Sequence, residues 1–187
     1  MNISPAKYLG NALAVCDSKV ESQCHLLASN LDGARSRKAS VFLCGNGGSA
    51  SNANHWANDL LYGAGHTGLG GIRAHSLSAN TAVTSCLAND TGYENIFSAQ
   101  LEVLASPRDI LITLSGSGNS SNIIRALEKA NALGLETWCI VGFDGGKAIG
   151  LAQHAIHFRI DNMQLAEDLQ MMVCHLVTLA LTTPRNA

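Results

Sequence analysis

Residues 41–50 read Val41-Phe42-Leu43-Cys44-Gly45-Asn46-Gly47-Gly48-Ser49-Ala50. The run of apolar residues is too short for a helix and is bounded by glycine, which is typical of a strand buried on both faces. The glycines permit a tight turn, and a stretch with helical character follows over 49–62. A strand that leads through glycines into a helix is the unit from which parallel α/β folds are built.

The same unit recurs along the chain. Apolar runs at 41–44, 72–77, 110–114, 137–141 and 155–160 are expected to be strands, and the stretches 49–62, 80–88, 94–104, 119–134 and 164–182 to be helices. Residues 5–31 are predicted to form one long N-terminal helix. The alternation predicts a parallel sheet with helices on both faces. The chain of 187 residues has no linker-like segment, so 1–187 is expected to be a single domain, with a helical segment 1–35 and a core over 40–182.

The composition limits the classes of partner. The net charge is −2, and no basic cluster exists beyond Arg35, Arg37 and Lys38, which argues against a nucleic-acid partner. The sequence has no run of 18 apolar residues and begins with neither a basic nor an apolar segment, so we expect no membrane span and a cytoplasmic location. The six cysteines form no CxxC pair and are expected to be reduced core thiols.

The last predicted helix carries apolar residues on almost every side, among them Leu169, Val173, Leu176 and Leu179. A helix of this kind has to be buried all round. A domain of this size rarely encloses a peripheral helix alone, so the helix is expected to pack against another subunit, together with part of the N-terminal helix. A central position inside a monomer is the alternative.

The first glycine loop matches the dinucleotide fingerprint G-x-G-x-x-[GA] at Gly45, Gly47 and Ala50. A dinucleotide site also needs an acid at the end of the next strand to bind the ribose. That strand ends His75-Ser76-Leu77-Ser78-Ala79-Asn80, without an acid. The sequence therefore favours no nucleotide cofactor.

The second loop follows the strand at 110–114 and reads Ser115-Gly116-Ser117-Gly118-Asn119-Ser120-Ser121-Asn122. Its backbone N–H groups and hydroxyls lie at a helix N-terminus, where they favour a phosphate dianion. The loop lacks the Lys of a P-loop and the GxSxG of a hydrolase elbow. A neutral loop of this kind suits a sugar phosphate, and a Ser/Asn-capped turn without a ligand is the alternative.

Two pairs of polar residues are candidates for a metal site. His55 and Asp59 are four residues apart and share a helix face, which allows both to bind one divalent metal; a simple surface pair is the alternative. The last helix carries Glu167, Asp168 and His175 among its apolar residues. At 100° per residue, Asp168 lies within about 20° of His175 and Glu167 within about 80°, so helix geometry leaves both acids open.

Taken together, these residues resemble the sugar isomerase (SIS) domain family and, within it, the phosphoheptose isomerases. The matching features are Cys44 to Ser49, the helix with His55, Asn89-Asp90-x-Gly92, Ser115 to Ser120, Gly142-Phe143-Asp144-Gly145-Gly146-Lys147, and the helix with His175. The resemblance implies a three-layer αβα sandwich with a Rossmann-like, flavodoxin-like sheet of five parallel strands and an extra N-terminal helix. It also implies a homotetramer with active sites at subunit contacts.

The resemblance further implies an activity and a set of site residues. The activity is the interconversion of sedoheptulose 7-phosphate and D-glycero-D-manno-heptose 7-phosphate. The implied phosphate and sugar contacts are Asn46, Gly47, Gly48, Ser49, Asn89, Asp90, Ser115, Gly116, Ser117, Ser120 and Glu167. The implied ligands of a divalent metal, zinc by preference, are His55, Asp59, Glu167 and His175. Asp59 is the expected base and His175 the expected acid in a proton transfer through an enediol.

Two of these residues depart from the family pattern. Asp59 stands where Glu is usual and is one methylene shorter, and Glu167 stands where Gln is usual. A second acid makes the site more anionic, which favours metal binding and weakens Lewis acidity. The alternative function is a non-catalytic SIS protein that binds a phosphosugar or a replication initiator; the two His/acid pairs favour the enzyme, since buried charges need a role.

Overall fold

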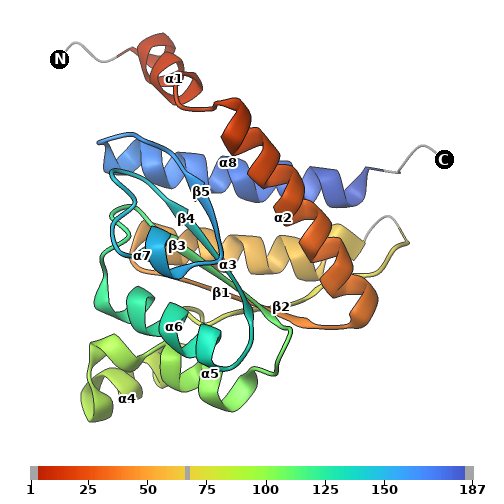
Figure 1. The fold of residues 1–187 in the computed structure, drawn as a ribbon, viewed down its shortest axis with the longest axis vertical. Helices are drawn as coiled ribbons and strands as arrows, with labels where there is room; N and C mark the ends of the chain where they lie inside the picture. The colour runs from red at the N-terminus through yellow and green to blue at the C-terminus, as the bar shows by residue number, and fades with distance from the viewer. Residues whose placement is uncertain (1–3, 66–67, 184–187) are drawn as a thin grey trace.

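The computed structural model describes residues 4–65 and 68–183 and has a parallel five-stranded sheet at its centre (Figure 1). All four neighbouring strand pairs are parallel, in the order β2-β1-β3-β4-β5. This is the flavodoxin-like order, which confirms the predicted fold class. The strands are β1 (Ser40–Gly45), β2 (Arg73–Ser76), β3 (Ile110–Ser115), β4 (Glu136–Val141) and β5 (His154–His157).

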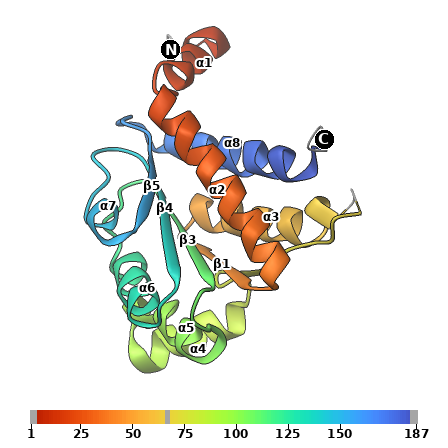
Figure 2. The ribbon, with the colours of Figure 1, turned by 45° about the vertical axis from the view of Figure 1, so that its right-hand side comes forward.

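Helices cover both faces of the sheet (Figures 1 and 2). Side chains alternate along each strand, so Val41 and Leu43 point to one core, and Phe42 and Cys44 to the other. The first core is closed by α2 (Ser18–Arg37), α3 (Gly48–Leu61) and α8 (Met163–Thr182). The second is closed by α4 (Thr81–Thr91), α5 (Ser98–Leu104), α6 (Ser121–Ala132) and α7 (Ala148–Leu151).

The predicted single helix over 5–31 is wrong. The segment forms two helices, α1 (Pro5–Leu13) and α2, because Asp17 accepts a hydrogen bond from the backbone N–H of Val20 and begins a new helix. Other predicted element boundaries also differ from those in the structure. The predicted helix 94–104 is a 3₁₀ turn (Tyr93–Asn95) followed by α5, and β5 ends at residue 157 instead of 160.

Helix α8 is buried on the side that faces α2 and α3, while Leu176 and Leu179 on its other side are exposed. By length and composition alone this helix could cross a membrane, but 44% of its apolar window is buried inside the protein. The packing against α2 and α3 accounts for the apolar residues on the buried side of the helix, so we assign α8 to the core.

The six cysteines are free, as predicted. Cys44, Cys139 and Cys174 are buried, whereas Cys86 is exposed on α4, so the expectation that every thiol lies in the core is wrong for Cys86. The assignment of residues 1–187 to a single domain stays a prediction, and residues 1–3, 66–67 and 184–187 lie outside the described part of the chain.

The carboxyl ends of β1 and β3 form the switch point of the sheet. From β1 the chain turns to α3 on the first face, and from β3 it turns to α6 on the second face. The two loops leave the sheet toward opposite faces, and ligands of doubly wound proteins bind in the region between such loops. The two glycine-rich loops identified from the sequence are the two loops at this point.

Candidate functional site

The loop after β1 needs glycine at two positions. A Cβ on Gly45 would come within 2.6 Å of the backbone carbonyl of Ser49, and Gly47 has a φ of +56° in front of the first residue of α3. The hydroxyl of Ser49 is buried and donates to Oε1 of Gln170 on α8, at 2.9 Å. The loop thus brings backbone atoms, not side chains, to the start of α3, where N–H groups favour an anion.

The serine hydroxyls of the loop after β3 keep hydrogens that they can donate to a ligand. The hydroxyl oxygens of Ser115 and Ser117 accept from the backbone N–H groups of Gly118 and Asn119, at 3.0 and 3.3 Å. A hydroxyl that accepts in this way can still donate its own hydrogen. Ser120 caps α6 without a side-chain capping bond, so its hydroxyl also remains available. Three hydroxyls and a helix N-terminus thus lie where the phosphate cradle is expected, and phosphate binding there stays a prediction.

The two loops are joined by side chains. The amide of Asn46 donates to Oδ1 of Asn122 at 2.9 Å, and the amide of Asn122 donates back at 2.8 Å. The hydroxyl of Tyr93 also donates to Oδ1 of Asn46, at 2.9 Å. Asn46 therefore links the loop after β1 to the start of α6 and to the segment after α4.

The predicted sugar contacts Asn89 and Asp90 lie exposed on α4, where the Asn89 amide donates to the Asp90 carboxylate at 2.8 Å. That bond, followed by one from the Cys86 thiol, lowers the pKa of Asp90. The carboxylate is therefore charged at neutral pH. The 3₁₀ turn that follows α4 contacts the loop after β1 through the hydrogen bond from Tyr93 to Asn46.

His55, Asp59 and His175 come together between α3 and α8. The Nε2 atoms of His55 and His175 are 3.0 Å apart, and the Nε2 of His55 is 3.2 Å from Oδ2 of Asp59. One ligand atom from each of the three lies within 4.8 Å of the others. The side chain of His55 is 45% exposed and that of Asp59 is 21% exposed, so the group can be reached from solvent.

These distances fit a metal site. Tetrahedral ligands about 2.1 Å from a zinc ion lie about 3.4 Å from one another, close to the separations of His55 from His175 and from Asp59. Two imidazoles and a carboxylate are also ligands that zinc, iron, nickel and manganese accept. Burial raises the pKa of the neighbouring Cys174 thiol well above its usual value, so it stays neutral and adds no ligand charge.

The two acids of α8 have different neighbours. Asp168 accepts a hydrogen bond from the hydroxyl of Tyr8 on α1, at 2.7 Å. Glu167 lies instead over the start of α3, where a Cβ on Gly48 would overlap its carboxylate. The acid that faces the glycine loop is therefore Glu167. The described residues that group as metal donors are His55, Asp59 and His175, and a metal role for Glu167 stays a prediction.

Three polar residues of the site were missed by the sequence reasoning. Asn122 bridges the loops, and Gln170 accepts hydrogen bonds from Ser49 and, at 3.3 Å, from Asn52. The amide of Asn52 also donates to the backbone carbonyl of Glu167 at 2.9 Å. One signal was present: Asn52 lies one turn before His55 and Gln170 one turn after Glu167, on the same helix faces.

The parallel sheet and the two loops at its switch point define a doubly wound α/β protein. The sequence model of the SIS domain family matches residues 7–142, and the chain belongs to that family.

Its relatives are phosphoheptose isomerases. The one from Helicobacter pylori (strain P12) is 36% identical over 169 residues, which cover 90% of this chain and 85% of that protein. The one from Aliarcobacter butzleri (strain RM4018) is 46% identical over 109 residues, 57% of this chain and 56% of that protein. A structure of a phosphoheptose isomerase from Francisella tularensis shares the fold, with a TM-score of 0.86 at 21% identity over 94% of this chain and 92% of that one. Within its family the chain is of the phosphoheptose isomerase type.

Proposed function

We propose that this chain interconverts sedoheptulose 7-phosphate and D-glycero-D-manno-heptose 7-phosphate. The observation that carries the proposal is that α3 connects the expected phosphate cradle with the group of possible metal ligands. The helix begins at the loop that Asn46 joins to the serine cradle, and it carries His55 and Asp59, which meet His175. A phosphosugar bound by its phosphate at the cradle would lie along α3 toward these three side chains.

The spacing supports a long sugar chain. His55 lies seven residues after Gly48, which is about 10 Å along the helix axis. An extended covalent chain advances about 1.2 Å per bond, so the roughly eight bonds from C1 of a seven-carbon sugar to the phosphorus of its 7-phosphate cover about 10 Å. A heptose phosphate is therefore about as long as the stretch of α3 from Gly48 to His55.

The isomerisation moves one proton between C1 and C2 and another between the oxygens on these carbons, through an enediol. Asp59 takes the proton from one carbon and returns it to the other. His175 moves the second proton between the two oxygens. Ser115, Ser117 and Ser120 hold the phosphate, so its binding energy keeps the reacting carbons near Asp59.

The donor group of His55, Asp59 and His175, with Glu167 as the fourth ligand that we propose, would hold a divalent metal. Zinc is the first choice, and manganese, iron and nickel take the same ligands. When bound, the metal supplies stabilisation of the negative charge that develops on the enediolate oxygens.

The test is an assay of interconversion with both heptose phosphates. His175→Ala is compared with His25→Ala, because His25 is an exposed histidine of α2 that pairs with Glu21 away from the site. We expect His175→Ala to lose at least about 100-fold in kcat, the scale of a lost acid/base group. Equal activity in the two variants would remove His175 from the chemistry.

A phosphosugar-binding protein without catalysis is the alternative from a different class. It would bind sedoheptulose 7-phosphate without turnover and would hold no stoichiometric metal. Metal analysis of the purified protein, followed by the assay with added zinc, separates the two functions, since the donor group on α3 and α8 serves only the enzyme.

We further propose that the chain works as a homotetramer in the cytoplasm. Helix α1 has no buried residue, and Leu13 on α1 and Leu179 on α8 are 74% and 62% exposed. Such leucines are stabilised by burial against another copy. Light scattering tests this: Leu179→Glu should yield smaller species, whereas Val103→Glu, at an exposed position of α5, should not. A wild-type monomer would refute the assembly.

A further inference from the structure

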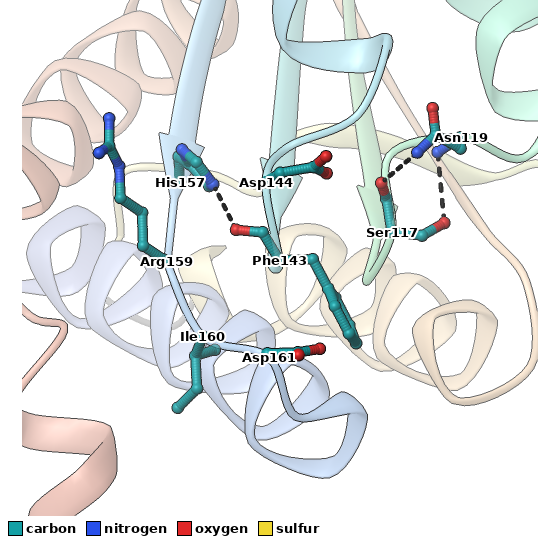
Figure 3. A pocket seen from close by; sticks show the side chains of 8 residues that line it. All are labelled: Ser117, Asn119, Phe143, Asp144, His157, Arg159, Ile160 and Asp161. Atoms are coloured by element: carbon teal, nitrogen blue, oxygen red, sulfur yellow. Dashed lines mark hydrogen bonds between the residues drawn. The ribbon is translucent and has the colours of Figure 1, made fainter.

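A cavity of about 820 Å³ lies at the carboxyl ends of β3, β4 and β5 (Figure 3). It is lined by Ser117 of the serine loop, by Phe143 and by His157. The cavity lies on the side of the serine loop that faces β4 and β5, and the proposed function assigns no role to Phe143 or His157. The serine loop is therefore one wall of this cavity.

Phe143 has a backbone conformation that is rare for an aromatic residue. Its φ is +46°, in the left-handed region, which is costly for residues with bulky side chains. Two hydrogen bonds hold it there. Its N–H donates to the carbonyl of Ile160 at 3.0 Å, and its carbonyl lies 3.0 Å from Nε2 of His157. Because a carbonyl only accepts, Nε2 of His157 carries the proton in this bond.

The strained backbone sets the position of the Phe143 ring. A Cβ on Gly116 would lie 3.8 Å from Cε2 of Phe143, so the ring packs beside the serine loop. Figure 3 shows the Phe143 ring pointing away from His157 and Asp144. The two loops are locked together, since the N–H of Ala148 donates to the carbonyl of Gly118 at 3.0 Å.

We propose that Phe143 is a specificity-determining residue whose ring forms the wall next to the phosphate cradle and lies against the phosphate-bearing end of the bound sugar's carbon chain, before the chain turns along α3. His157 is a positioning residue that keeps the ring in place through the Phe143 carbonyl. The inference rests on the proposed function, because it requires the phosphate at the serine loop. An aromatic wall beside a few polar groups is the usual make-up of a small-molecule site, and it favours a ligand that presents C–H groups to the ring.

The test uses Phe143→Asn, because asparagine adopts the left-handed conformation readily and removes only the ring. Phe143→Tyr keeps the ring and is the matched control. The probes are sedoheptulose 7-phosphate and inorganic phosphate, bound in calorimetry, together with kcat and KM. We expect Phe143→Asn to raise the Kd and KM of the sugar phosphate about tenfold. Its affinity for inorganic phosphate should stay unchanged, and Phe143→Tyr should resemble the wild type.

His157 is tested by a pair of variants. His157→Gln can still donate to the Phe143 carbonyl, whereas His157→Leu cannot. We expect His157→Leu to raise KM as Phe143→Asn does, and His157→Gln to restore it. Equal KM values in the pair would overturn the positioning role.

The outcomes separate this inference from the proposed function. If the wild type is active and the Kd for the sugar phosphate is unchanged in Phe143→Asn, the proposed role of Phe143 is overturned. The proposed isomerase activity then stands. A loss of inorganic phosphate affinity in the same variant also overturns it, because the ring would then act on the loop alone. If the wild type is inactive but its Kd for the sugar phosphate still depends on Phe143, the proposed isomerase activity is overturned. The proposed role of Phe143 in binding then stands.

Discussion

The side-chain amides of Asn46 and Asn122 hydrogen-bond to each other in both directions, at 2.9 and 2.8 Å. Asn46 belongs to the loop after β1 and Asn122 to the first turn of α6, so the pair spans the switch point of the sheet. Asn122 is buried, with 1% of its surface exposed. The pair fixes the distance between the two loops, and a pocket formed by both loops depends on it.

Replacement of Asn122 by alanine should therefore affect stability and substrate binding together. We expect Asn122→Ala to lower the free energy of unfolding by about 1–3 kcal/mol, because the buried Asn122 side chain is lost and the half-buried Asn46 amide loses its partner. Urea unfolding of Asn46→Ala, Asn122→Ala and the double variant measures the coupling, which should be about 1 kcal/mol. Additive effects would show that the two amides do not act as a pair. The KM of the sugar phosphate should rise in each single variant.

The metal prediction concerns His55 on α3. His55→Ala removes one of the three grouped donors, and a lost metal ligand should abolish stoichiometric zinc binding. Plasma emission analysis of protein purified with zinc in the medium measures the content, with His25→Ala as the matched control. Removal of the metal by a chelator should abolish activity, and added zinc should restore it. Equal metal content in His55→Ala and His25→Ala would contradict the site.

The sequence predicts the two loops well, because their glycines are required by local backbone geometry. Gly45 and Gly47 are needed whatever the rest of the fold does. The contact between Asn46 and Asn122 could not be predicted, since it depends on β1 and β3 being neighbours, which is a property of the whole sheet. The order of the strands is set by packing of the whole chain and not by any one segment.

The two acids of α8 show a second limit. Helix periodicity gives the angle between residues of one helix, and it does not decide which of Glu167 and Asp168 lies at the site with His175. The choice depends on the neighbouring helices: α1 binds Asp168 through Tyr8, and α3 receives Glu167 at Gly48. The wrong prediction of one long N-terminal helix has a related cause. Apolar periodicity runs through the break, and only the cap at Asp17 marks it.

Two glycines of the first loop should respond differently to alanine. In Gly45→Ala the new Cβ meets the backbone of Ser49, which cannot move, so we expect the free energy of unfolding to fall by about 1–3 kcal/mol. In Gly48→Ala the new Cβ meets the end of the flexible Glu167 side chain, and alanine favours the helix by up to about 1 kcal/mol. Gly48→Ala should fold with wild-type stability, with Glu167 displaced.

The consequence for activity follows from the displaced carboxylate. If Glu167 acts at the site as proposed, Gly48→Ala should lower kcat/KM at least about tenfold despite wild-type stability, a loss of about 1.4 kcal/mol in the transition state. Urea unfolding and steady-state kinetics on the same preparations check both parts. Full activity of Gly48→Ala would show that the position of Glu167 is unimportant.

The contact between Tyr8 and Asp168 predicts a late titration of one tyrosine. The hydrogen bond to the Asp168 carboxylate, followed by burial and the charge of Asp168, raises the pKa of Tyr8 to about 12 from 10.0. A raised pKa means that the folded state favours the protonated phenol. The contribution to stability is therefore complete below about pH 10 and is lost as the pH rises toward 12.

Ultraviolet absorbance of the phenolate measures this titration, and the difference between the wild type and Tyr8→Phe isolates Tyr8 from the other two tyrosines. Asp168→Asn should return the pKa of Tyr8 toward 10, since a neutral amide accepts a weaker hydrogen bond. An unchanged titration in Asp168→Asn would show that α1 is not held to α8 by this pair.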